Sequence, residues 1–293
     1  TANMIWAVAN LQEALPETSG LLPLLIELAT FNVGEMKIQE LSNVFWAVAK
    51  LRSKASELKR FVPVLTQMII DRADDASPQN LSNILWAVAT MHCEFPEALE
   101  LVPVLVEVLP EKVDSMKAQE VANTLWSLSV LQPERDEAVQ MLLRTLQRVM
   151  VSKLGECKLS DITQSMGALA TLDAKDDIVL ETTARHVAAL LPSMDGRSFG
   201  LNVPGIFFAF AKLGFPHEEE LAAAVAGRFP SLRQRLTDWS LCALVWSYRL
   251  RGGEQEYAPL MASLEQEVRR RGIPAAKVDH ARLGSLKWDS WEG

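Results

Sequence analysis

The sequence contains few cysteines and none of the common residue patterns of catalysis. Its three cysteines, Cys93, Cys157 and Cys242, are far apart and none belongs to a CxxC pair. Neither a disulfide framework nor a zinc site is therefore predicted. The four histidines are equally scattered, and no HExxH, GxxxxGKS/T or GxSxG motif is present. We expect no enzymatic activity, no cofactor and no metal centre.

Long apolar runs and an excess of basic side chains are also missing. No stretch approaches the ~20 consecutive apolar residues that span a bilayer, so no membrane span is predicted. Residues 1–225 carry 18 basic and 29 acidic side chains, whereas residues 226–293 carry 11 and 8. Tight non-specific binding to nucleic acid depends on many cations. Any phosphate contacts should therefore be local, and the sequence places them near the C-terminus.

The most informative feature of the sequence is a set of four near-identical motifs. They read TANMIWAVANL, LSNVFWAVAKL, LSNILWAVATM and VANTLWSLSVL, and their tryptophans recur at steps of 40 residues. A fixed period of this size indicates one structural unit stacked on itself. Weaker copies continue at steps of 41, 41 and 38 residues, which makes seven repeats. Their central positions are Trp6, Trp46, Trp86, Trp126, Gly167, Phe208 and Trp246.

Each repeat reads as two antiparallel helices joined by a short connection. In the second repeat we expect a first helix near residues 21–30, a break at residues 32–34 and a second helix over residues 38–51. The apolar residues of that second helix follow the i, i+3, i+4, i+7 spacing of a buried face. They are Leu41, Val44, Phe45, Val48 and Leu51.

The predicted fold is therefore all-α, an αα-solenoid superhelix of about seven helix-pair repeats. Repeat arrays have no internal domain boundary, because each unit packs on its neighbours. The array should cover residues 1–271, with residues 272–293 as a C-terminal tail. Its first repeat begins inside a helix pair, which leaves Met4, Ile5 and Val8 without a preceding helix. We expect this edge to be covered by further residues or by a partner chain.

The tryptophans point away from the apolar stripe, and small residues flank them. Ala47 and Ala49 border Trp46, and Ala87 and Ala89 border Trp86. A helix that is apolar on two sides should be sandwiched between neighbours. We therefore expect each tryptophan to be buried in the core, where it fills the hollow left by small residues of an adjacent repeat.

One narrow polar stripe accompanies the tryptophans. A glutamine and an asparagine precede the ring by seven and three residues, and a variable residue follows it by four. These amides could form a hydrogen-bonded ladder between repeats, or they could face a groove and contact nucleobase edges while nearby cations contact phosphates. On the second interpretation the candidate RNA-binding residues are Asn43, Asn83, Asn123, Gln164, Lys50, Lys212, Arg249, Arg251, Arg269, Arg270 and Arg271.

The phrases QELSNVFWAVAKL and QNLSNILWAVATM closely resemble octotricopeptide-type repeats of organellar RNA-maturation proteins. They are also similar to the helical repeats that precede RAP domains and to those of FAST-kinase-like mitochondrial proteins. The resemblance covers nearly the whole chain and is closest over residues 1–131. It implies an αα-solenoid in a chloroplast or mitochondrion that binds single-stranded RNA or belongs to an organellar ribonucleoprotein. The residues after Arg271 are too few for a RAP domain.

The alternative to RNA binding is that the protein acts as a scaffold for other proteins. The same superhelix could hold proteins within a large organellar assembly such as a ribosome or a photosynthetic or respiratory complex. The acidic excess over residues 1–225 suits a basic protein surface better than it suits RNA. Convergence of Lys50, Lys212 and the C-terminal arginines beside the amides would favour RNA, and a groove lined by Asp and Glu would favour protein.

Overall fold

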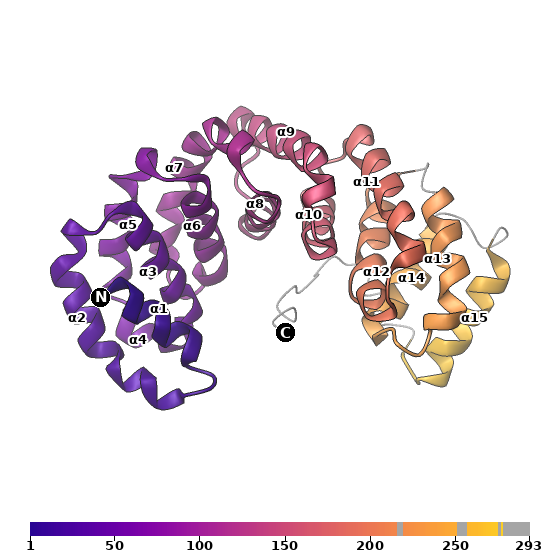
Figure 1. Cartoon of the computed structure of the whole chain (residues 1–293), viewed down its shortest axis with the longest axis horizontal. Coiled ribbons are helices and arrows are strands. Elements are labelled where there is room, and N and C mark those ends of the chain that lie inside the picture. Colours follow the sequence, from indigo (N-terminus) through magenta and orange to yellow (C-terminus); the bar gives the residue numbers. More distant parts are fainter. Residues whose placement is uncertain (216–218, 251–256, 275–276, 278–293) are drawn as a thin grey trace. The chain divides into compact units, whose positions relative to one another are not determined.

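The computed structural model describes residues 1–215, 219–250, 257–274 and 277, and of residues 19, 55 and 219 only the backbone. These residues form helices and no strand, which confirms the predicted all-α class (Figure 1). The α-helices are α1 (Ala2–Leu11), α2 (Leu22–Asn32), α3 (Ile38–Lys50), α4 (Ala55–Leu58), α5 (Val62–Ile70), α6 (Pro78–Met91), α7 (Leu101–Val108), α8 (Ala118–Leu131), α9 (Glu137–Ser152), α10 (Leu159–Thr171), α11 (Asp177–Leu190), α12 (Gly196–Lys212), α13 (Glu219–Leu232), α14 (Asp238–Leu250) and α15 (Ala258–Arg270).

Short 3-10 helices occupy many of the connections. They are Pro16–Leu21, Val33–Glu35, Arg52–Lys54, Ala73–Asp75, Pro96–Glu100, Leu109–Glu111, Val113–Ser115, Leu154–Glu156 and Leu191–Ser193. The turn from a first helix to its second helix therefore keeps one compact form along much of the chain.

The first compact unit spans Thr1–Lys153. Within it, α1, α3, α6 and α8 pack side by side in chain order, and they carry the four tryptophan phrases. The helices α2, α5, α7 and α9 form a second layer against them (Figure 1). The four tryptophan-containing motifs thus lie in one layer of this unit.

The second compact unit spans Leu154–Gly293. Its inner row consists of α10, α12 and α14, again packed in chain order. The helices α11 and α13 pack on each other, and α15 packs against α14. Each unit is thus built from helices that pack against their neighbours.

The predicted helices of the second repeat are present with ends that differ by one or two residues. The first helix is α2, which includes Asn32 of the predicted break, the turn is the 3-10 helix Val33–Glu35, and the second helix is α3. The predicted apolar stripe is fully enclosed, because each of its five residues has no exposed surface. They are Leu41, Val44, Phe45, Val48 and Leu51.

The prediction for the N-terminal edge is wrong in two of its three residues. Ile5 and Val8 are buried because α1 packs on both α2 and α3, whereas Met4 is 54% exposed. Exposed large apolar residues of this region lie on α1, on α2 and on the segment between them. Besides Met4 they are Trp6, Leu11, Leu15, Leu21, Leu24, Leu28 and Phe31.

Buried hydroxyl groups fix the register of neighbouring second helices. Ser42 Oγ of α3 donates to the carbonyl of Asn80 in α6 at 3.3 Å, and Ser82 Oγ of α6 donates to the carbonyl of Glu120 in α8 at 3.1 Å. Both donors lie four residues before a tryptophan, and both acceptors lie six residues before the next one. The same bond therefore recurs one repeat further on, which ties the rows of side chains on these helices to one register.

Three arginines join one helix pair to the connection of the pair before it. Arg72 donates to the carbonyls of Gly34 and Met36, and Arg228 donates to those of Pro192 and Met194. Arg271 does the same with the connection before α14, as described below. Each guanidinium thereby satisfies backbone carbonyls that a helix end leaves without an intrahelical partner.

Candidate nucleic-acid interface

A row of partly exposed side chains follows α3, α6 and α8 in the first unit. Positions seven and three residues before each tryptophan, the tryptophan itself and the position four residues after it lie on one face of the helix. We call this set the amide–tryptophan stripe, and no position in it is acidic. It consists of Gln39, Asn43, Trp46 and Lys50, then Gln79, Asn83, Trp86 and Thr90, then Gln119, Asn123, Trp126 and Val130.

The tryptophans of successive repeats stack on one another. The ring centroids of Trp6 and Trp46, Trp46 and Trp86, and Trp86 and Trp126 are 6.5, 6.0 and 6.3 Å apart, with interplanar angles of 30°, 29° and 30°. The predicted contact between neighbouring repeats is thus confirmed. The predicted burial in the core is wrong, because Trp6 is 47% exposed and the other three are half-buried. The hollow beside each ring is filled by the next ring, and one side of the stack stays open to solvent.

Among the described residues, Asn43 and Asn83 do not take part in a hydrogen-bonded ladder. Asn43 and Asn83 are half-buried, and their side-chain amides bond to no other group among the described residues. Asn123 occupies the same position on α8 and does interact within the protein. A primary amide offers both donors and an acceptor. Two adjacent repeats therefore present the same unused hydrogen-bonding groups beside a tryptophan.

Three of the side chains that lie four residues after a ring make contacts with their own helix. Thr90 Oγ1 donates to the carbonyl of Trp86 at 2.8 Å, and Asn10 donates to the carbonyl of Trp6 at 2.8 Å. The Lys50 ammonium lies 5.8 Å from the centroid of Trp46, within range of a cation–π contact. These side chains fold back onto their own helix, whereas the amides of Asn43 and Asn83 do not bond to theirs.

Two lysines that the sequence analysis did not single out immediately precede two of the helices that carry the stripe. Lys37 and Lys117 are the residues before α3 and α8, and both are exposed. In the part of the chain that the structure describes, neither ammonium group has a carboxylate partner. Their recurrence nine residues before Trp46 and Trp126 is the signal that could have identified them. The N-termini of these helices are capped by carboxylates, because the backbone N–H groups of Lys37 and Lys117 donate to Glu40 and Glu120 at 2.9 Å each.

The remaining predicted RNA-binding residues belong to the second unit or lie outside the described residues. Gln164 on α10 and Lys212 at the end of α12 are half-buried. Arg249 on α14 pairs with Glu265 of α15 at 2.8 Å, and Arg269 lies 3.8 Å from the same carboxylate group. Arg251 lies outside the described residues. Within the second unit, Arg249 and Arg269 thus already share one acidic partner, Glu265.

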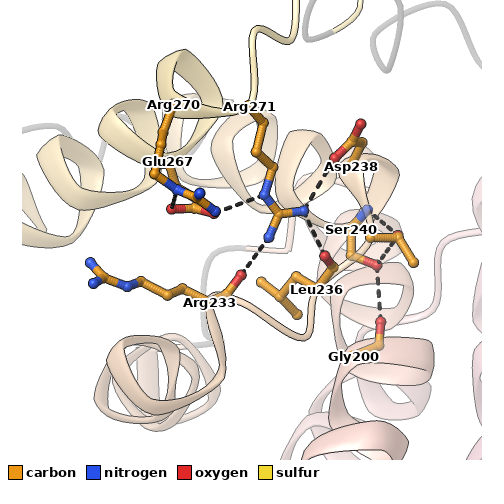
Figure 2. A network of polar contacts seen from close by, with 9 residues as sticks. Gly200, Arg233, Leu236, Asp238, Ser240, Glu267, Arg270 and Arg271 are labelled. Atoms are coloured by element: carbon orange, nitrogen blue, oxygen red, sulfur yellow. Dashed lines mark hydrogen bonds and ion pairs between the residues drawn. The ribbon is translucent and has the colours of Figure 1, made fainter.

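Arg270 and Arg271 are held by acidic partners at the end of α15 (Figure 2). Arg270 Nη2 and Arg271 Nε donate to Oε1 of Glu267 at 2.6 and 2.8 Å. The Arg271 guanidinium also donates to the carbonyls of Arg233 and Leu236, at 2.7 Å each, and to Asp238 at 3.1 Å. Its side chain is only 16% exposed. The charges of Arg270 and Arg271 are thus largely neutralised by acidic partners. Arg271 in addition holds α15 against the turn before α14.

Glu267 gives the second unit an acid-sensitive contact. Hydrogen bonds from Arg270 and Arg271 hold the pKa of this buried carboxyl down from 4.5 to about 2. Because its pKa is lower in the folded protein than in the unfolded chain, the contribution is complete above about pH 4.5 and is lost as the pH falls toward 2. We expect urea unfolding midpoints to decline less between pH 5 and pH 2.5 in Glu267→Gln than in the wild type. Parallel pH profiles for the two proteins would contradict this assignment.

The described residues show no other site chemistry. They contain no cluster of His, Cys, Asp or Glu that could hold a metal ion, and none of their helices is long and apolar enough to cross a membrane. Burial and nearby acidic groups raise the pKa of the Cys157 thiol to about 11, which disfavours the reactive thiolate. The sequence matches no family model and no curated protein.

Proposed function

We propose that the chain is a non-catalytic αα-solenoid of seven helix-pair repeats that binds single-stranded RNA in an organellar ribonucleoprotein. One observation carries the proposal: Asn43 and Asn83 present unpaired amides beside a partly exposed tryptophan stack. Single-stranded RNA is read through hydrogen bonds to exposed base edges and contacts with aromatic side chains. The chloroplast or mitochondrion as the location follows from the resemblance to octotricopeptide-type repeats.

The spacing of the tryptophans constrains how a strand could bind. Stacked bases rise by about 3.4 Å per nucleotide, so a base between two parallel rings needs about 6.8 Å. The rings are 6.0–6.5 Å apart and tilted by about 30°, which leaves no room for a base between them. The strand would instead lie across the open side of the stack, unstacked, with one base edge at each asparagine.

The phosphates in this arrangement lie toward the N-terminal ends of α3 and α8. Lys37 precedes Asn43 by six residues, which is about 9 Å along a helix axis. Lys117 has the same offset from Asn123. These two lysines replace the C-terminal arginines as the favoured phosphate contacts, because Arg249, Arg269, Arg270 and Arg271 already have acidic partners.

A second candidate function is a scaffold that binds an extended polypeptide of a large organellar assembly. An extended chain rises 3.2–3.4 Å per residue, so its side chains return to one face at about 6.6 Å. The tryptophan steps of 6.0–6.5 Å are close to that distance. A free asparagine amide can also pair with a peptide group, and the acidic excess of residues 1–225 suits a basic partner.

Fluorescence anisotropy with short single-stranded RNAs of random sequence tests the first function. At low ionic strength we expect binding that weakens as salt rises. The double variant Lys37→Glu, Lys117→Glu should weaken binding to every sequence and lower the salt slope by about 2, because each phosphate contact contributes about one. Arg144→Glu, an exposed arginine on α9, is the matched control and should bind nearly as the wild type does.

Two outcomes would favour the scaffold. The first is no salt-dependent affinity for any RNA at low ionic strength. The second is a loss of binding free energy in Arg144→Glu about half that of the double lysine variant, as expected if only the total charge of the protein matters, because the control changes the net charge by two and the double variant by four.

A further inference from the structure

We infer that α2 carries a docking surface for a basic amphipathic helix of a partner protein. The surface is a row of four apolar side chains, which we call the α2 seam. It lies on a different helix from the amide–tryptophan stripe, so the inference is independent of the proposed RNA-binding function. The four side chains are Leu21, Leu24, Leu28 and Phe31, and they are between 42% and 88% exposed.

The α2 seam is a second apolar face of its helix. The first is the buried face, which Leu22, Leu25 and Ala29 form. On an α-helix the four seam positions fall within a sector of about 80°, centred about 110° from that buried face. Their spacing of three, four and three residues is that of the positions along which helices pack in a coiled coil. A helix that is apolar on two faces is normally sandwiched between neighbours, whereas the seam of α2 is open to solvent.

The two following repeats show what kind of neighbour the seam fits. The first three seam positions are apolar there too, and they are buried or half-buried. Their equivalents, 40 and 80 residues later, are Phe61, Val64 and Met68, then Leu101, Val104 and Val108. The helix α7, which carries the second set, packs against α5, the first helix of the repeat before it. A helix is therefore the neighbour that these positions take within the array.

The fourth seam position distinguishes α2 from the other first helices. Its equivalents in the two following repeats are Asp71 and Glu111, which are exposed carboxylates. Phe31 places an apolar ring at this position, and the ring is 88% exposed. The repeat pattern does not account for the ring, because the pattern is acidic there. Phe31 extends the seam toward the C-terminal end of α2 with an aromatic side chain, a type enriched in protein interfaces.

The charge around the seam favours a basic partner. Residues 1–36 contain four glutamates, all exposed, and neither lysine nor arginine. Glu27 directly precedes Leu28 on α2, beside the seam. A helix with basic residues beside its apolar face meets opposite charge there. A second copy of this chain would instead bring two acidic surfaces together, because an isologous interface uses the same patch on both partners.

A peptide from the array itself is a suitable probe. Residues 58–72, LKRFVPVLTQMIIDR, include α5 and carry three basic side chains and one acidic side chain. Fluorescence anisotropy of the labelled peptide, titrated with the whole chain at low ionic strength, measures binding. We expect saturable binding at least about 10-fold tighter than that of a scrambled peptide of the same composition, because only the native order forms an apolar helix face. Equal affinity for the scrambled peptide would overturn the inference.

The double variant Leu24→Ala, Leu28→Ala ties this binding to the seam. Both side chains are exposed, so the protein should stay folded, which circular dichroism checks. We expect the variant to bind the peptide at least about 10-fold more weakly than the wild type. Ile178→Ala on α11 is the matched control, because it removes an apolar side chain that is 73% exposed, and it should bind as the wild type does. A folded double variant with wild-type affinity would contradict the assignment to the seam.

Two further measurements test the nature of the occupant. The peptide variant Lys59→Glu, Arg60→Glu should bind about 5-fold more weakly at low salt, and an unchanged affinity would refute the basic partner. Sedimentation equilibrium of the protein alone tests a second copy as the occupant, and we expect a monomer. A dimer that dissociates in the Leu24→Ala, Leu28→Ala variant would assign the seam to a second copy and would overturn the partner helix.

Discussion

Replacing Arg271 with alanine is expected to lower the free energy of unfolding of the second unit by about 3 kcal/mol, as for other buried charged contacts. Its guanidinium bonds the carbonyls of Arg233 and Leu236 and also Asp238 and Glu267 (Figure 2). Without it, the buried Glu267 carboxylate keeps only Arg270, and two carbonyls lose their donor. Urea unfolding, followed through tryptophan fluorescence and helical circular dichroism, measures the change.

Arg269→Ala is the matched control, from the same arginine run. Arg269 lies 3.8 Å from Glu265 and its side chain is 70% exposed, so its removal should cost less than about 0.5 kcal/mol. Equal stability of the two variants would contradict the structural role of Arg271. A stable Arg271→Ala protein with weakened RNA binding would instead support the RNA contact that the sequence predicts for this residue.

The helices could be predicted from the sequence because their signals are local and repeated. A buried face at i, i+3, i+4, i+7 depends only on neighbouring residues. Leu41, Phe45 and Val48 consequently lie where the pattern places them. The role of Arg271 could not be predicted in the same way, because its carbonyl partners are 35 and 38 residues away. Arg72 lies 14 residues before Trp86 and Arg228 lies 18 before Trp246, so no fixed spacing marks these arginines.

The residues of the candidate site could be predicted from the sequence, whereas their hydrogen bonding and exposure could be predicted only in part. The period places Asn43 and Asn83 on one face with the tryptophans, and the structure confirms this. Periodicity does not say whether an amide is bonded, since that depends on distances between helices. The exposure of the rings was missed for a related reason: a tryptophan can contact the adjacent repeat through another tryptophan and leave one side open. Lys37 and Lys117 lie within residues 1–225, where acidic side chains outnumber basic ones, so the charge distribution points to the C-terminus instead.

Trp86→Ala is expected to lower the free energy of unfolding by about 2–3 kcal/mol, since each aromatic pair adds about 0.5–1.5 kcal/mol to the burial of the ring. Trp86 stacks on Trp46 at 6.0 Å and on Trp126 at 6.3 Å, so the substitution removes both pairs from the middle of the stack. The loss stays below the ~3–5 kcal/mol of a fully enclosed tryptophan because one side of this ring is already open. Urea unfolding measures it.

Trp6→Ala and Trp86→Phe are the controls that separate stacking from burial. Trp6 has one neighbouring ring in the stack and is 47% exposed, so its removal should cost only about 1 kcal/mol. Trp86→Phe keeps an aromatic ring between Trp46 and Trp126, and should retain most of the stability and most of the RNA affinity. If Trp86→Ala costs no more than Trp6→Ala, the stack does not hold the repeats together. If stability is unchanged while RNA binding is lost, the rings serve the ligand alone, because a ring that stabilises the stack cannot be removed without weakening the contact between α3, α6 and α8.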